Sequence, residues 1–261
     1  MKWTIVICGV VILSACSSGF AQQPGPLAPN DVRDLQLIEM PAANTSNPTF
    51  AIFLSGDGGW ATLDRNISNE LVTRGISVVA LNTRNYLWRK KTADQAGSDM
   101  IRIIRHYMDA WSKKRVAIVG YSRGADIAPF MVARLPDDLK ARVSIFAMLA
   151  LSNTTNFQFH LMDIFTESHR PSDVKTLPEV ERLRGMNLLC IYGADEKDSG
   201  CRDAPAGLMK EVVRSGGHHF DSDYKALGDD YFASVIKPNG LVADLKGTYR
   251  SKIKSRQYWS L

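Results

Sequence analysis

Short apolar-rich runs alternate along the chain with segments in which apolar residues recur about every three to four positions. The runs lie at residues 35–38, 50–54, 77–81, 116–119, 143–149, 188–192 and 211–214. Those that read VAIV and LLCIY contain no charged position, which is typical of parallel strands covered on both faces. The pattern therefore predicts strands at all these places, several of them central in one sheet.

Helical periodicity fills most of the intervals between the runs. In the clearest case, five apolar residues share one helical face: Met100, Ile101, Ile104, Met108 and Trp111. Further helices are predicted at residues 64–74, which Gly75 would close, and at 125–135, 178–184 and 230–236. Alternating strands and helices predict an α/β fold, with a mostly parallel sheet and helices on both faces.

A serine lies between two glycines where one run gives way to a helical pattern. The segment VAIVGYSRGADIAPF, residues 116–130, places Ser122 in a Gly-x-Ser-x-Gly motif. The motif alone is a weak signal, but a strained turn after a buried strand and before a helix exposes the serine hydroxyl. The alternative is a glycine-lined turn from strand to helix in which Ser122 has no catalytic role. The context favours Ser122 as a nucleophile.

A serine nucleophile needs a base, and the base needs an acid that orients it. After such a turn, both are expected later in the chain, in the order acid and then histidine. Asp195 follows the run at 188–192 and is the predicted acid, with Glu196 and Asp198 as alternatives. The order and the strand ends together predict a catalytic triad.

Two adjacent histidines are candidates for the base. His218 and His219 follow a two-glycine loop after the last predicted strand. Only one of them can point at Ser122. We favour His218, because it follows the glycine pair directly, and keep His219 as the alternative.

Acyl transfer also needs N–H donors for the developing oxyanion. Arg123, directly after the nucleophile, is expected to give one of them. The loop FLSGDGGW, residues 53–60, suits the other, with Asp57 and Gly58 as candidates; a plain glycine-rich turn is the alternative. The loop lacks the ending of a phosphate-binding loop, and no metal-ligand spacing or cofactor motif accompanies it. Triad chemistry requires neither a metal nor a cofactor.

The interval at about 152–176 fits neither strand nor helix. It is polar, with scattered aromatic residues and two histidines. Inserted between two parallel strands, it would sit above their carboxyl ends, where ligands bind. A lid-like insertion over the site is the functional interpretation, and a surface excursion with a small satellite core is the alternative.

The first residues have the layout of an export signal, which we place at residues 1–21: Lys2 precedes an apolar run at 5–13, and small residues follow. The stretch LSAC resembles a lipobox that would leave Cys16 lipidated, whereas GFA at 19–21 resembles an ordinary cleavage site. A linker is expected at 22–31 and one domain at 32–261.

After export, Cys190 and Cys201 would remain. An oxidising compartment permits a disulfide between them, and a simple buried strand cysteine at position 190 is the alternative. The net charge of +5 is modest, so direct nucleic-acid binding is not expected.

The segments FLSGDGGW, GYSRGAD, YGADEKD and GGHHF together resemble the VirJ/AcvB bacterial virulence family, and the chain is most similar to its VirJ branch. The resemblance extends from about residue 50 to the C-terminal region. It implies an α/β-hydrolase fold, a periplasmic location and a part in type IV secretion. Carried over by motif, it implies Ser122, Asp195 and one of the two histidines as the catalytic set of a serine esterase.

AcvB-type members are implicated in hydrolysing lysyl-phosphatidylglycerol, so the resemblance implies an aminoacylated phospholipid at a membrane surface as the substrate. A lysyl ester carries a cation beside the scissile carbonyl, and Asp57 and Asp126 are the carboxylates expected to bind it. Pairing with Arg123 is the alternative role of Asp126. The tail at 246–256 has five basic residues and is a candidate for contact with anionic lipid, or else a solvated end.

Two other functions compete with this one. The same scaffold could serve as a non-catalytic accessory factor that binds type IV secretion substrates or channel components. It could also act as a general carboxylesterase on small esters.

Overall fold

The computed structural model describes residues 30–44, 46–159, 172–222, 242–244 and 258–260 of the 261-residue chain. The signal sequence, most of the linker, the helix predicted at 230–236 and the basic tail at 246–256 lie outside these ranges. The middle of the predicted insertion, 160–171, also lies outside them.

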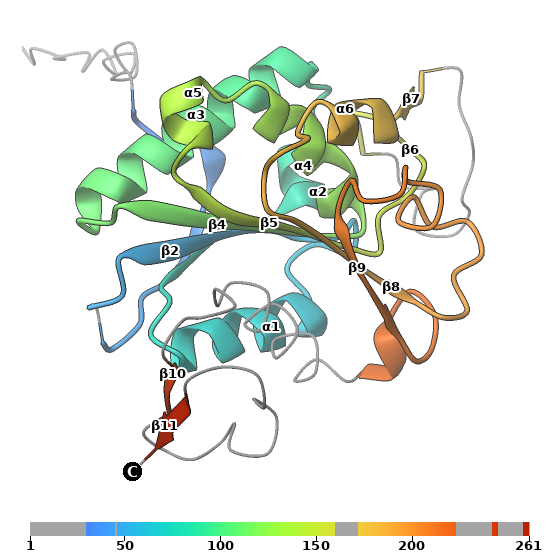
Figure 1. The fold of residues 1–261 in the computed structure, drawn as a ribbon. Helices are drawn as coiled ribbons and strands as arrows, with labels where there is room; N and C mark the ends of the chain where they lie inside the picture. Colours follow the sequence, from blue (N-terminus) through green and yellow to red (C-terminus); the bar gives the residue numbers. More distant parts are fainter. Residues whose placement is uncertain (1–29, 45, 160–171, 223–241, 245–257, 261) are drawn as a thin grey trace, which may run out of the picture.

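A single large sheet organises the fold (Figure 1). Its strands are β1 (Ile38–Met40), β2 (Thr49–Leu54), β3 (Val78–Leu81), β4 (Arg115–Tyr121), β5 (Val143–Leu149), β8 (Leu188–Gly193) and β9 (Lys210–Arg214). Their order in the sheet is β1-β3-β2-β4-β5-β8-β9. Only β1 is antiparallel to its neighbour, so the predicted, mostly parallel sheet is confirmed.

The first strand begins later than the sequence pattern predicted. Arg33–Leu35 form a short 3-10 helix, η1, in which Leu35 is buried. Gln36 then turns the chain with a positive φ of 50°, and β1 starts at Ile38. The apolar residues at 35–38 thus belong to two elements, because a tight turn separates them.

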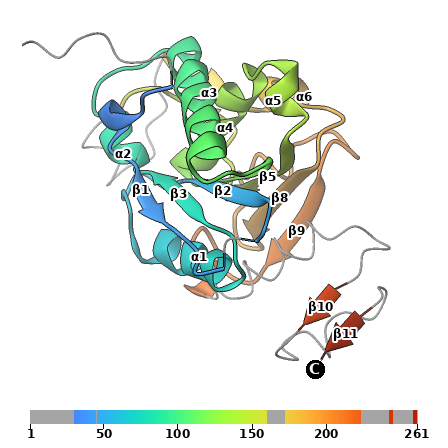
Figure 2. The same ribbon diagram turned by 90° about the vertical axis from the view of Figure 1, so that its left-hand side faces the viewer.

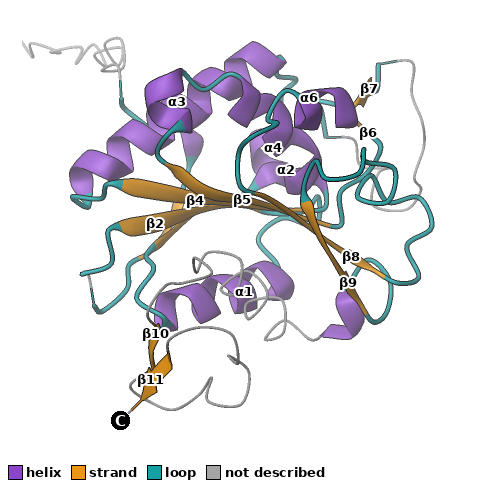
Figure 3. Ribbon diagram, in the orientation of Figure 1, coloured by secondary structure: helices purple, strands orange, loops and turns teal. Residues whose placement is uncertain are grey.

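Helices cover both faces of the sheet (Figure 2). Helix α1 (Thr62–Thr73) lies on one face, and α3 (Ala93–Ala110) and α4 (Arg123–Ala133) lie on the other (Figure 3). The short helices are α2 (Thr83–Tyr86), α5 (Asp137–Lys140) and α6 (Leu177–Glu181). Helix α4 runs on past Pro129 to Ala133.

The two helical layers create two hydrophobic cores. In β2, Phe50, Ile52 and Leu54 join the core beneath α3 and α4, whereas Ala51 and Phe53 join the core above α1. Every side chain of the strand is therefore buried or nearly so. This explains why the central strands show no alternation of polar and apolar residues.

Two further pairs of short strands are separate from the main sheet. Within the predicted insertion, β6 (Thr154–Thr155) pairs antiparallel with β7 (Val174–Lys175). Near the C-terminus, β10 (Val242–Asp244) pairs parallel with β11 (Tyr258–Ser260). No helix in the described ranges is both long enough and apolar enough to span a bilayer.

Candidate active site

Ser122 occupies a strained turn between β4 and α4. Its φ of 51° and ψ of −123° lie in a region that residues with a side chain rarely adopt. The neighbouring glycines allow the turn, because a Cβ at Gly124 would lie 2.2 Å from the Leu54 carbonyl oxygen, and one at Gly120 would lie 2.6 Å from the Gly124 oxygen. The backbone N–H of Ser122 donates to the Leu149 carbonyl at 2.9 Å. The turn therefore holds the serine at the carboxyl edge of the sheet.

His218 contacts the serine. Its Nε2 lies 2.8 Å from Ser122 Oγ, although the two residues are 96 positions apart in the chain. His219 points elsewhere, and its Nδ1 lies 2.9 Å from the Tyr121 hydroxyl. The glycines before the histidine pair let this loop approach β8, since a Cβ at Gly193 would lie 2.4 Å from the Gly216 and Gly217 carbonyl oxygens. The structure thus places the histidine that the sequence favoured beside Ser122.

The carboxylate that contacts His218 belongs to Glu196, so the expectation of Asp195 is corrected by one position. Glu196 Oε1 lies 2.7 Å from His218 Nδ1, and its Oε2 accepts the Gly193 N–H at 2.7 Å. Asp195 is exposed, and its N–H donates to the Gly216 carbonyl.

The turn after β8 explains why residue 196, and not residue 195, faces His218. Strand β8 ends at Gly193, and the Glu196 N–H closes a turn onto the Gly193 carbonyl at 3.1 Å. This turn directs position 195 toward solvent and position 196 toward the histidine. Asp198, the other alternative from the sequence, is also exposed.

The surroundings of His218 favour its charged form. Burial, the largest single influence, lowers its pKa. The hydrogen bond that His218 donates to Glu196 and the charges of Glu196, Asp126 and Asp57 outweigh burial, so that the pKa of His218 is raised above its ordinary value. Glu196 can therefore stabilise a proton that His218 takes up.

Asp126 lies beneath the site in the first turn of α4. It is buried, and its Oδ1 accepts the Ser152 N–H at 2.7 Å. Burial raises the pKa of Asp126 to about 7, against the backbone hydrogen bond from Ser152 and the charge of Arg123. The sequence gave no signal of the Ser152 contact, because it joins segments 26 positions apart. Asp57, by contrast, is only partly buried.

The predicted oxyanion donors belong to two segments, the start of α4 and the loop after β2. The N–H of Arg123 lies in the first turn of α4, directly after Ser122. The loop after β2 passes close by, since a Cβ at Gly56 would lie 3.5 Å from the Cβ of Ser122. The Gly59 N–H bonds to the Gly56 carbonyl, so the Asp57 and Gly58 N–H groups remain the candidates that the sequence named.

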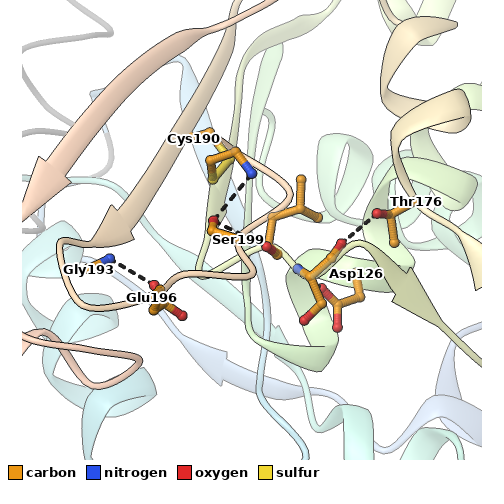
Figure 4. The surroundings of a disulfide bond; sticks show 9 residues. Asp126, Thr176, Cys190, Gly193, Glu196 and Ser199 are labelled. Carbon is orange, nitrogen blue, oxygen red and sulfur yellow. Dashed lines mark hydrogen bonds between the residues drawn. A yellow bond between two sulfur atoms is a disulfide. The ribbon is translucent and has the colours of Figure 1, made fainter. Parts of the chain in front are cut away.

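A disulfide joins Cys190 and Cys201, which lie on either side of Glu196 in the sequence (Figure 4). Cys190 lies in β8, and both cysteines are fully buried. The bond that the sequence permitted is thus present, and it encloses the turn that carries Glu196. In the part of the chain that the structure describes, no cluster of histidine, cysteine and carboxylate side chains could hold a metal ion.

Solved structures with a similar architecture include esterases and other enzymes. Est1E from Butyrivibrio proteoclasticus, solved with bound ferulic acid, is 11% identical with a TM-score of 0.52, and the match covers 78% of this chain and 98% of that one. The Pyrococcus furiosus esterase Pf2001 is 13% identical with a TM-score of 0.53, covering 81% and 97%. MenH from S. aureus is 10% identical with a TM-score of 0.53, covering 76% and 97%. These likenesses establish the class: the protein has the α/β-hydrolase fold.

The sequence places the chain within that class. Residues 48–237, well over half of its length, match the family described as bacterial virulence protein (VirJ), and the chain belongs to this family. A search of curated proteins found no match.

Proposed function

We propose that the protein is a serine ester hydrolase whose catalytic triad is Ser122, His218 and Glu196. One observation carries the proposal: His218 lies within hydrogen-bonding distance of Ser122 Oγ through Nε2, at 2.8 Å, and of Glu196 through Nδ1, at 2.7 Å. This is the arrangement in which an imidazole can remove the hydroxyl proton and be held in the correct tautomer. The strained turn at Ser122 is consistent with the role of a nucleophile.

The reaction follows from these positions. Ser122 Oγ attacks the ester carbonyl carbon while its proton passes to His218 Nε2, and the carbonyl oxygen becomes an oxyanion. The Arg123 N–H and an N–H of Asp57 or Gly58 would stabilise that charge. The intermediate collapses to an acyl-serine, and the departing alcohol takes the proton from His218. Water then attacks the acyl group with His218 as base, which releases the acid and restores Ser122.

The proposed substrate is the aminoacyl ester of a phospholipid, with lysyl-phosphatidylglycerol as the specific compound. The family resemblance is the basis of this choice, and two carboxylates near His218 support it. Of the two, Asp57 is the better partner for a lysyl ammonium group, because it is only partly buried. Asp126 is buried and bonded to Ser152, so we assign it to the support of the site rather than to the cation.

A basic surface beside the site suits a substrate embedded in a membrane. Arg84, Trp88, Arg89 and Lys90 form what we call the site-edge patch; all four are exposed, and Trp88 is 58% exposed. Residues 83–93 contain no carboxylate. Exposed tryptophan beside arginine and lysine is typical of protein surfaces that rest on lipid headgroups.

The patch is fixed to the same edge of the sheet as the nucleophile. It follows β3, and the Thr83 N–H donates to Ser55 Oγ in the loop that passes Ser122. Trp88 stacks on Phe159, with ring centroids 5.8 Å apart, and the Phe159 N–H donates to the Leu87 carbonyl at 2.8 Å. The patch would therefore bring lipid headgroups to the face that carries Ser122.

We further propose that the protein acts in the periplasm and supports type IV secretion, as the family resemblance implies. The Cys190–Cys201 disulfide supports an oxidising compartment. Lipidation at Cys16 and the cleavage site remain expectations from the sequence.

A fluorophosphonate probe tests the proposed chemistry directly. We expect the probe to label Ser122, and Ser122→Ala to abolish both labelling and release of lysine from lysyl-phosphatidylglycerol vesicles while the circular dichroism spectrum is retained. His218→Ala should abolish labelling, and its neighbour His219→Ala is the matched control that should not. If wild-type protein and Ser122→Ala release lysine equally, the hydrolase proposal is wrong. If neither protein releases lysine, and Ser122→Ala still restores virulence to a deletion strain, the accessory-factor alternative is favoured.

A further inference from the structure

The loop that supplies the acid is closed on itself by a covalent bond. Cys190 lies inside β8, and Cys201 lies 11 positions later, beyond the turn that carries Glu196. The two Cα atoms are 5.8 Å apart. Residues 190–201 therefore form a ring, which we call the acid loop, and Glu196 is near its middle.

Hydrogen bonds hold the two ends of the acid loop to different parts of the fold. On the near side, the Ala194 N–H donates to the carbonyl of Arg214, the last residue of β9, at 2.7 Å. On the far side, the Gly200 N–H donates to the Leu151 carbonyl at 2.8 Å, just after β5. The fit there is close, since a Cβ at Gly200 would lie 3.0 Å from the Ser152 oxygen.

The position of Glu196, in the middle of the acid loop, depends on how the two ends of the loop are held. Lys197 and Asp198 are exposed, and they connect Glu196 to the buried Ser199. Cys201 is itself fully buried, and its N–H donates to Ser199 Oγ at 3.3 Å. The disulfide thus returns the far end of the loop to β8, the strand from which the Glu196 turn starts.

We propose that the Cys190–Cys201 disulfide is a positioning element for the catalytic acid: it keeps the acid loop closed so that Glu196 stays against His218. The inference rests on the proposed hydrolase function. Without the bond, the chain between β8 and Ser199 has more conformations to sample, and the geometry at 2.7 Å is populated less often. The two cysteines act through Glu196 and touch neither substrate nor Ser122.

The proposal also makes activity depend on the redox state of the compartment. The bond forms when the two thiol hydrogens pass to a donor disulfide, which is reduced to two thiols. In a reducing compartment the cysteines stay as thiols and the acid loop is open. The hydrolase would then become fully active only after it reaches an oxidising compartment.

A double-mutant cycle tests the route through Glu196. The variants are Cys190→Ala/Cys201→Ala, Glu196→Gln and the combination of the three. We expect the cysteine variant to lower kcat/KM at neutral pH by about tenfold or more, and to move the acidic limb of the pH profile to lower pH, because Glu196 raises the pKa of His218. In the Glu196→Gln background, removal of the cysteines should change kcat/KM by less than about threefold. Independent, multiplicative losses would overturn the proposal, and so would an unchanged pH profile.

Two controls separate positioning from lost stability. Leu71→Ala removes a fully buried side chain from α1, away from the acid loop, and should lower the melting temperature without moving the pH profile. The pKa of His218, followed by NMR in the Ser122→Ala background and assigned with His218→Gln, should fall when the cysteines are replaced. This second measurement needs no turnover. If the fluorophosphonate fails to label Ser122, the hydrolase function fails; if the His218 pKa is unmoved, only the disulfide inference fails.

Discussion

At the scale of single residues, the turn at Ser122 depends on glycines, which have no side chain. Gly124 lies where α4 passes under β2, and a Cβ there would meet the backbone oxygen of Leu54 at 2.2 Å. Backbone atoms cannot give way as the end of a flexible side chain can. Gly58 lies in the neighbouring loop, and a Cβ there would meet nothing within 4 Å.

These two glycines make a matched pair of substitutions. We expect Gly124→Ala to reduce the free energy of unfolding by at least about 2 kcal/mol, because the added methyl must displace backbone. Gly58→Ala should change it by no more than about 0.5 kcal/mol. Urea unfolding of both variants is the measurement. If the two variants have similar free energies of unfolding, the backbone around the turn at Ser122 can relax to accommodate a Cβ.

The proposed catalytic acid gives a second prediction at this scale. Glu196→Asn, and more conservatively Glu196→Gln, removes the negative charge that raises the pKa of His218. Since the base must be neutral to accept the serine proton, the acidic limb of kcat/KM should move to lower pH while the maximal rate falls. Asp195→Asn is the control on the adjacent, exposed position and should leave the limb in place. A shift caused by Asp195→Asn instead would return the acid role to Asp195.

At the scale of elements, Asp126 connects α4, the helix that follows Ser122, to the segment after β5. Its pKa of about 7 in the fold lies above the ordinary value of 3.8, so the folded state holds this proton more tightly than the unfolded chain does. The resulting stability is present at low pH and is lost as the pH rises from about 4 through about 7. Asp126→Asn keeps an acceptor for the Ser152 N–H and carries no charge.

We therefore expect Asp126→Asn to gain stability relative to wild type as the pH is raised. Urea unfolding of both proteins at pH 5 and pH 8 measures the effect. The other titrating groups are the same in both proteins, so their contributions cancel in the difference between the two unfolding free energies. A difference in unfolding free energy that stays the same at the two pH values would show that Asp126 is ionised throughout this range.

These elements also show which parts of the fold and of the candidate site could be predicted from the sequence. The strands were predictable because both faces of β2, β4 and β8 are buried, which removes polar positions from each run. The serine and the favoured histidine were predictable because each follows a strand at a glycine-marked turn. The carboxylate that contacts His218 lies one residue after the predicted one, because the rotation of the turn after Gly193 depends on its contacts with the end of β9 and the loop that follows it. The Asp126–Ser152 contact left no local pattern at all.

At the scale of the whole molecule, Ser122, the site-edge patch and the paired strands β6 and β7 of the insertion all lie at the carboxyl edge of the sheet. The opposite edge carries basic residues too: Lys114 and Arg115 are exposed where β4 begins. Net charge alone would attract a membrane to either edge. The arrangement of Trp88 with Arg89 and Lys90 favours the edge that carries Ser122.

Vesicle binding distinguishes the two edges. Each basic residue near an anionic surface contributes about 1 kcal/mol, so Arg89→Gln/Lys90→Gln should weaken binding to phosphatidylglycerol vesicles roughly 30-fold. Lys114→Gln/Arg115→Gln removes the same charge from the opposite edge and should weaken binding much less. Trp88→Ala should also weaken binding, and neither it nor the Arg89/Lys90 variant should affect the hydrolysis of a small soluble ester.

Equal losses for the two charge pairs would indicate non-specific attraction, and unaltered binding in both would leave the basic tail at 246–256 as the lipid contact. If a single-stranded oligonucleotide displaced the protein from vesicles through the same residues, the patch would instead be a nucleic-acid surface.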